Sequence, residues 1–77
     1  RMTGDWKLQL GALGDSGNAD RLASRLANNS ALGGVRVERE AAGRLTKVMA
    51  VGYPSRDAAE SACSALKRGG QDCLVTR

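Results

Sequence analysis

The chain is 77 residues long, with 42% hydrophobic residues, 26% charged residues and a formal net charge of +4. A chain of this length forms one domain with a thin core, because it buries only about 60% of the surface that its unfolded form exposes. No apolar run approaches the roughly 20 residues that cross a bilayer, and without histidine or a Cys/His cluster no metal site or cofactor is expected.

The first half of the chain reads as strand, helix, strand. Residues 6–13 form the first predicted strand, and alternation gives it a buried side made of Trp6, Leu8, Leu10 and Ala12. Asp15 or Ser16 can cap a helix over residues 17–28. One buried stripe of this helix is predicted at Ala19, Leu22, Ala23 and Leu26. A second strand over residues 34–40 is expected to bury Val35 and Val37 and to expose Arg36 and Glu38.

The second half repeats this order at an offset of forty residues. The turn AAGR, in which Gly43 can take a positive φ, leads to a third strand over residues 44–52 that buries Thr46, Val48 and Ala50. Ser55 can cap the second helix, whose buried stripe is Ala59, Ala62, Cys63 and Leu66. Gly69 and Gly70 end it, and a short strand follows over residues 72–76.

The predicted order is therefore βαββαβ. Both crossovers must be right-handed, so the two helices lie on the same side of one four-stranded antiparallel sheet. This is a ferredoxin-like α+β fold with strands one and three at its centre. The domain is expected to span residues 5–77, with residues 1–4 as a linker or a remnant.

The other side of this sheet is predicted to be exposed. Because neighbouring strands lie about 4.8 Å apart, the side chains that point there form one contiguous patch. The patch mixes apolar and polar groups, as binding surfaces do, although one face of an antiparallel sheet also commonly just faces water. Its predicted members are Lys7, Gln9, Gly11 and Leu13 of the first strand and Leu45, Lys47 and Met49 of the third.

Two stretches resemble the SPOR (sporulation-related repeat) family. WKLQLGALGDSGNADRLASRLAN is similar to the opening of that domain, which has an aromatic residue, an apolar–Gln–apolar–Gly stretch and an Ala/Leu helix. KVMAVGYPSRDAAESACSALKRGG is similar to its third strand and second helix, but VGY stands in place of the family's Gly-Pro-Phe and Pro54 comes one position late. The exposed positions of strand three carry Leu45, Lys47 and Met49 where members often have an aromatic residue or arginine.

The resemblance implies a monomeric, non-catalytic module that binds peptidoglycan at division sites, on glycan strands without stem peptides. It implies that Gln9 belongs to the binding face and that Gly11 lets a sugar approach the backbone. The expected location is periplasmic or otherwise extracytoplasmic. The expected parent protein has a membrane tether, either a transmembrane helix or a lipid anchor, before Arg1.

Other function classes find less support in the residues. An enzyme is not expected, because the sequence offers no nucleophile–base pair and no phosphate-binding glycine loop. The alternative is an RNA-binding domain of the RRM type, which shares the βαββαβ order and a basic charge. Such a domain stacks bases on aromatic residues of strands one and three, and the only aromatic residues in the chain are Trp6 and Tyr53. A protein–protein interaction module is a third class, without a positive sign in the sequence.

Cys63 and Cys73 are the only cysteines. Both are expected to point into the same end of the core, Cys63 from the second helix and Cys73 from the last strand. They can form one disulfide, which an extracytoplasmic compartment would favour, or remain two small buried thiols.

Overall fold

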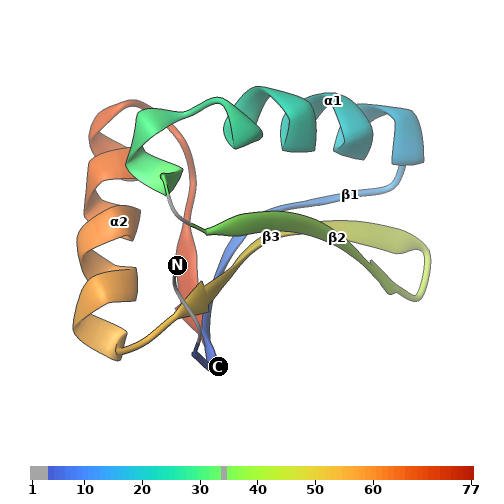
Figure 1. The fold of residues 1–77 in the computed structure, drawn as a ribbon. Helices are drawn as coiled ribbons and strands as arrows, with labels where there is room; N and C mark the ends of the chain where they lie inside the picture. Colours follow the sequence, from blue (N-terminus) through green and yellow to red (C-terminus); the bar gives the residue numbers. More distant parts are fainter. Residues whose placement is uncertain (1–3, 34) are drawn as a thin grey trace.

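The computed structural model of the protein describes residues 4–33 and 35–77. The elements in these ranges are β1 (Trp6–Leu13), α1 (Ser16–Ala27), the short 3-10 helix η1 (Ser30–Leu32), β2 (Arg36–Ala42), β3 (Leu45–Tyr53), α2 (Arg56–Arg68) and β4 (Leu74–Thr76). The strands form an antiparallel sheet in the order β2-β3-β1-β4, with both helices on one side (Figure 1). The predicted ferredoxin-like α+β fold is thereby confirmed, with β1 and β3 at the centre.

Both helices begin after a side chain that caps them. Asp15 Oδ1 accepts hydrogen bonds from the backbone N–H groups of Gly17 and Asn18, at 2.7 and 3.2 Å. Ser55 Oγ does the same for Ala58, at 3.1 Å. These bonds satisfy N–H groups that have no partner inside the first helical turn, so each helix starts at a defined residue.

The core lies between the helices and the sheet. The buried stripes of the helices contribute Ala19 and Leu26 from α1 and Ala59, Cys63 and Leu66 from α2. Two core residues were not predicted: Leu32 of η1 and Tyr53 at the end of β3 are only 4% and 3% exposed. The turn η1 occupies part of the segment that follows α1, and β2 accordingly begins at Arg36 rather than at residue 34.

The last strand is shorter than predicted. It pairs with β1 only from Leu74 to Thr76, opposite Gln9 to Lys7. Before this point the side chain of Gln71 crosses to β1, and its Nε2 donates a hydrogen bond of 2.8 Å to the carbonyl oxygen of Leu10. That carbonyl is thus satisfied by a side chain instead of by a ladder partner, so β4 separates from β1 at Leu74.

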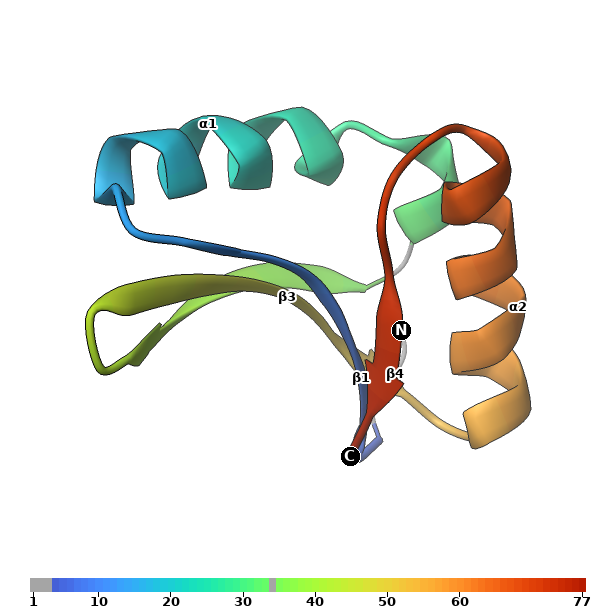
Figure 2. The same ribbon diagram turned by 180° about the vertical axis from the view of Figure 1, so that it is seen from behind.

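Two β-bulges deform the central pair of strands. Gln9 pairs with Met49 but Gly11 pairs with Val48, which leaves Leu10 as an extra residue in β1. In β3 the extra residue is Gly52, whose φ of 103° is accessible mainly to glycine. A bulge bends its strand and increases the local twist. Figures 1 and 2 show the resulting sheet, which is concave on the side away from the helices.

Cys63 and Cys73 are joined in a disulfide, with their Cα atoms 5.5 Å apart. The bond connects the middle of α2 to the residue that precedes β4. The sequence allowed either a disulfide or two free thiols, and the structure contains the disulfide. A three-residue edge strand is therefore covalently attached to the helix that covers it.

Tyr53 ends β3 and points into the core, where it is 3% exposed. Its hydroxyl has no hydrogen-bond partner among the described residues. Burial disfavours the ionised form and raises the pKa of Tyr53 above its ordinary value. The side chain therefore contributes apolar contacts to the core, while its hydroxyl opposes burial.

Replacing Tyr53 with phenylalanine should raise the free energy of unfolding at pH 7 by about 1 kcal/mol, because a buried hydroxyl without a partner costs about 1–3 kcal/mol. The unfolded chain ionises Tyr53 near pH 10, at a lower pH than the folded chain does, so this group makes wild-type stability fall as the pH rises above about 10. The Tyr53→Phe variant should lack the part of this decrease in stability that the tyrosine causes. Urea unfolding of both proteins at pH 7 and above pH 10 measures the difference, and parallel pH profiles would contradict the assignment.

Candidate functional site

The side of the sheet that faces away from the helices, which we call the open face, is defined by the strand register. Leu8, Val37, Ala50 and Val75 are paired neighbours that pack into the core, so the residues adjacent to them point the other way. The open face consists of Arg36, Glu38, Glu40 and Ala42 of β2, Leu45, Lys47, Met49 and Val51 of β3, Lys7, Gln9 and Ala12 of β1, and Leu74 and Thr76 of β4.

The floor of the open face is apolar. Met49 and Val51 are only 4% and 9% exposed, yet neither belongs to the core cluster between the sheet and the helices. The register places Gln9 and Glu38 beside Met49, and Lys7 and Arg36 beside Val51. Leu45 and Leu74 are 43% and 60% exposed and are the exposed large hydrophobic residues of the described chain. The face is thus a shallow trough with apolar contact area on its floor and at two of its margins.

Gln9 lies at the centre of this trough. It pairs with Met49 on one side and with Leu74 on the other. Its side chain is half-buried, and no hydrogen bond to it occurs among the described residues. A glutamine amide offers two donors and one acceptor carbonyl, so this position presents uncommitted hydrogen-bonding groups between two apolar neighbours.

Charge is unevenly distributed over the open face. Lys7 lies opposite Val51, whereas Lys47 lies between Ala12 and Glu40. Neither lysine takes part in an ion pair within the described part of the chain. Since Val51 is four residues from Lys47 along β3, the two ammonium groups extend from positions about 13 Å apart along the strands.

The acidic side chains of the face come from β2. Arg36 and Glu38 form an ion pair, with Arg36 Nε and Glu38 Oε2 3.4 Å apart, and both side chains remain largely exposed. Glu40 pairs across the ladder with Lys47. The β2 margin therefore carries both signs of charge, while β1 contributes only the cationic Lys7 and β4 only neutral residues.

Two of the predicted face residues lie on the other side of the sheet. The bulge at Leu10 shifts the alternation by one residue, so Gly11 pairs with the buried Val48, and Leu13 pairs with Thr46 and packs against the core. A Cβ atom at Gly11 would lie 2.9 Å from Leu22 Cδ2 of α1. Gly11 therefore faces Leu22 of α1 rather than the open face, and a larger residue here would require the end of the Leu22 side chain to shift. The same shift exposes Ala12, which was predicted to be buried.

Five predicted residues do share the open face: Lys7, Gln9, Leu45, Lys47 and Met49. The prediction missed the residues of the two edge strands, above all Leu74. The alternation of side chains along the last strand could have placed Leu74 on the open face, because it stands between Cys73 and Val75, which were both expected to point toward the helices. Arg36 and Glu38 were predicted to be exposed but were not assigned to the site.

Both aromatic residues lie on the helix side of the sheet. Tyr53 belongs to the core and Trp6 packs against it. The guanidinium carbon of Arg77 lies 5.0 Å from the centre of the Trp6 ring, a cation–π contact at the end of β1. The open face, whose residues are all described, consequently offers no ring on which a nucleic-acid base could stack.

The described residues contain no group of three or more His, Cys, Asp or Glu side chains placed to hold a metal ion. None of their helices is long and apolar enough to cross a membrane.

One protein-family model matches the sequence of this chain. The model of the SPOR domain matches residues 3–77, nearly the whole chain. The protein belongs to the SPOR domain family. No curated protein sequence matches this SPOR domain significantly.

Two solved structures resemble this SPOR domain. One is the solution structure of the peptidoglycan binding domain of the B. subtilis cell wall lytic enzyme CwlC, with 29% identity, a TM-score of 0.75, and coverage of 99% of this chain and 91% of the other. The second is the crystal structure of the RlpA SPOR domain from Pseudomonas aeruginosa, with 18% identity, a TM-score of 0.70, and coverage of 94% and 97%. The second likeness concerns the fold alone.

Proposed function

We propose that this SPOR domain is a non-catalytic module that binds peptidoglycan on its open face and recognises glycan strands without stem peptides. The observation that supports this most is the composition of the trough: an apolar floor, an uncommitted amide at its centre and two unpaired lysines. Membership of the SPOR family and the likeness to the peptidoglycan binding domain of CwlC support the choice of ligand.

The two lysines suit a polymer with repeated negative charges. A glycan strand that has lost its stem peptides exposes one lactyl carboxylate on each muramic acid residue. Lys7 and Lys47 extend from positions about 13 Å apart along the strands, so each can pair with a different carboxylate of one chain. In strands that retain their peptides, the carboxylate is an amide and this attraction is lost.

Gln9 supplies the complementary neutral contacts. Its amide can donate to the carbonyl oxygen of an acetamido group and accept from its N–H. Met49 and Val51 form the apolar floor on which the less polar side of a sugar ring can rest. Because each exposed ion pair contributes only about 0–1 kcal/mol, binding arises from several weak contacts along one strand.

RNA binding is the alternative that shares this fold. The open face has no aromatic residue on which bases could stack, since Trp6 and Tyr53 both pack on the helix side of the sheet. We therefore favour the glycan. The proposed setting is extracytoplasmic, and the proposed cellular role is to bring a division or cell-wall protein to the septum, where stripped strands occur.

Co-sedimentation with purified sacculi tests this function. We expect more of the domain to pellet after an amidase has removed the stem peptides than before. Gln9→Ala and Lys47→Glu should each weaken pelleting several-fold while changing the free energy of unfolding by no more than about 0.5 kcal/mol, because both positions are outside the core.

Arg56→Glu is the matched control for Lys47→Glu, because it reverses one charge on α2, on the other side of the sheet. It should pellet like the wild type apart from the small effect of net charge. If the wild type does not pellet with amidase-treated sacculi, the proposed function is wrong. If it does and both open-face variants pellet equally well, the ligand binds elsewhere on the domain.

A further inference from the structure

The open face continues into a notch at the point where β4 separates from β1. This notch has a volume of about 270 Å³, slightly below the range of about 300–1,000 Å³ typical of pockets for drug-sized ligands. Gln9 and Leu74 belong both to its lining and to the open face. The notch is lined by Gln9, Leu10 and Gly11 of β1, Lys67 of α2, and Asp72, Cys73 and Leu74.

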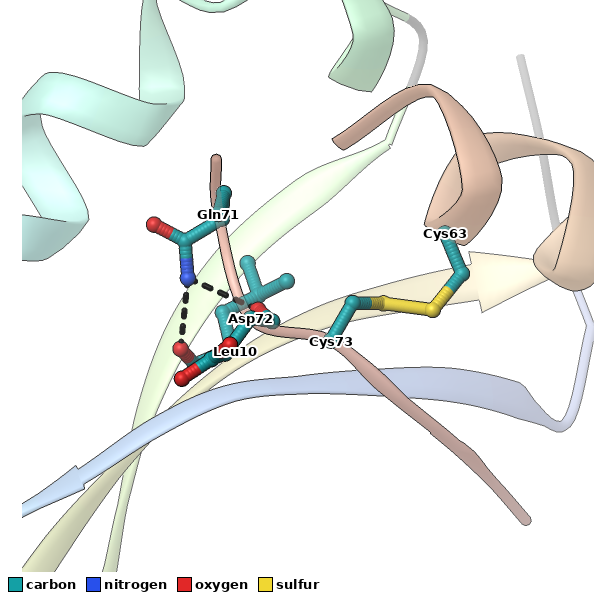
Figure 3. Close-up of a disulfide and its surroundings, with 5 residues drawn as sticks. All are labelled: Leu10, Cys63, Gln71, Asp72 and Cys73. Atoms are coloured by element: carbon teal, nitrogen blue, oxygen red, sulfur yellow. Dashed lines mark hydrogen bonds between the residues drawn. A yellow bond between two sulfur atoms is a disulfide. The ribbon is translucent and has the colours of Figure 1, made fainter. Parts of the chain in front are cut away.

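The walls of the notch are fixed by several independent bonds. Gln71 Nε2 donates to the carbonyl oxygens of both Leu10 and Asp72, at 2.8 Å each, and so holds the segment before β4 against the bulge in β1 (Figure 3). The disulfide attaches Cys73 to α2, as the same view shows. The backbone that surrounds the notch is therefore already in place before a ligand enters.

The notch carries both signs of charge. Lys67 lies in the last turn of α2 and Asp72 lies on the segment before β4, and both residues line the notch. Within the described chain, neither the Lys67 ammonium nor the Asp72 carboxylate has an ion-pair or hydrogen-bond partner. An anion would be repelled by Asp72 and a cation by Lys67. A neutral group that has both a donor and an acceptor is complementary to the pair.

We propose that this notch is a subsite for the N-acetyl group of a sugar residue whose polymer lies on the open face. The amide N–H would donate to the Asp72 carboxylate, the carbonyl oxygen would accept from Lys67, and the methyl group would contact Leu74. The proposal rests on the proposed function. It adds that the domain recognises the N-acetyl substituent of the polymer. It makes the acetamido group a determinant of specificity beside the lactyl carboxylate.

Two neutral oligosaccharides test the notch without the charged contacts of the open face. Chitohexaose and cellohexaose share a β-1,4-linked backbone and lack the lactyl carboxylate, and only chitohexaose carries acetamido groups. In a titration of the 15N-labelled domain, chitohexaose should shift the backbone amides of Lys67, Asp72 and Leu74. Cellohexaose should leave these three amides in place. Unmoved amides with chitohexaose, whether or not other residues shift, would overturn the proposal.

The variants Lys67→Ala and Asp72→Ala sharpen this test. Each should reduce the affinity ratio of chitohexaose to cellohexaose by about three- to tenfold, the effect of losing one hydrogen bond. Arg68→Ala is the matched control, because it removes a neighbouring positive charge that does not line the notch, and its ratio should equal that of the wild type. An unchanged ratio in both notch variants would overturn the subsite.

Sacculi separate failure of the subsite from failure of the proposed function. If wild type and Asp72→Ala pellet equally with amidase-treated sacculi, the open face binds glycan and the notch does not contribute. If neither pellets, the proposed function itself is wrong. Stronger pelleting with intact stem peptides than without them would contradict the proposed function, and the subsite that rests on it would fall as well.

Discussion

Replacing Leu26 with alanine should lower the free energy of unfolding by about 2–5 kcal/mol, the range for truncating a large buried aliphatic side chain. Leu26 of α1 is only 2% exposed and lies in the single core cluster of the described chain. The loss combines the transfer free energy of the removed carbons with the cavity that they leave. For a domain of this size such a loss can equal most of the total stability, since small domains are marginally stable.

Urea unfolding followed by circular dichroism measures this effect. Leu45→Ala is the matched control, because it makes the same chemical change at a side chain that is 43% exposed. It should cost well under half as much as Leu26→Ala. Equal losses in the two variants would show that α1 does not pack as described, and a Leu26→Ala protein that is already unfolded without urea would place the loss at the upper end of the range.

Removing the disulfide should cost about 2–3 kcal/mol, the value expected for opening a loop of roughly ten residues in the unfolded chain. The relevant variant is Cys63→Ala with Cys73→Ala, which leaves no free thiol. The effect is large because the bond connects α2 to β4, which has only three residues in the sheet. Once released, β4 is held by its ladder with β1 and by the Gln71 bond to Leu10.

Intact mass before and after alkylation without reductant establishes the oxidation state of the wild type, and two labelled thiols in the folded domain would contradict the bridge. Thermal unfolding of the double variant then gives its cost. A wild type whose midpoint is unchanged by reductant would show that the bond contributes nothing to stability. We expect the reduced wild type and the double variant to unfold at similar, lower temperatures.

Much of the fold follows from periodicity in the sequence. The stripe from Ala19 to Leu26, the caps at Asp15 and Ser55, and the repeat at forty residues predict two helices, their start points and the central pair β1 and β3. Each of these signals is local or internally repeated, so it does not depend on long-range contacts. Sequence alternation also places Lys7, Gln9, Lys47 and Met49 on one face, as the structure does.

Three errors in the first strand share one cause. The alternation of buried and exposed side chains along a strand does not show where an extra residue is inserted. An extra residue moves every later side chain to the opposite face of the sheet. The bulge at Leu10 therefore reversed Gly11, Ala12 and Leu13 together. The carbonyl of Leu10 is bonded there by Gln71, a tertiary partner sixty-one residues away. No local pattern in WKLQLGAL reveals that partner.

The curvature of the open face imposes a selection by shape. A flat surface can rest against a planar lattice of parallel chains over its whole area, whereas a hollow touches such a lattice only along its rims. A single strand that stands free of its neighbours can sink to the floor formed by Met49 and Val51. Under the proposed function, the curvature would therefore favour an isolated strand over a packed layer, in addition to the hydrogen bonds that the strand offers. Leu10 and Gly52, the extra residues of the two bulges, lie in the strands that form this curved surface.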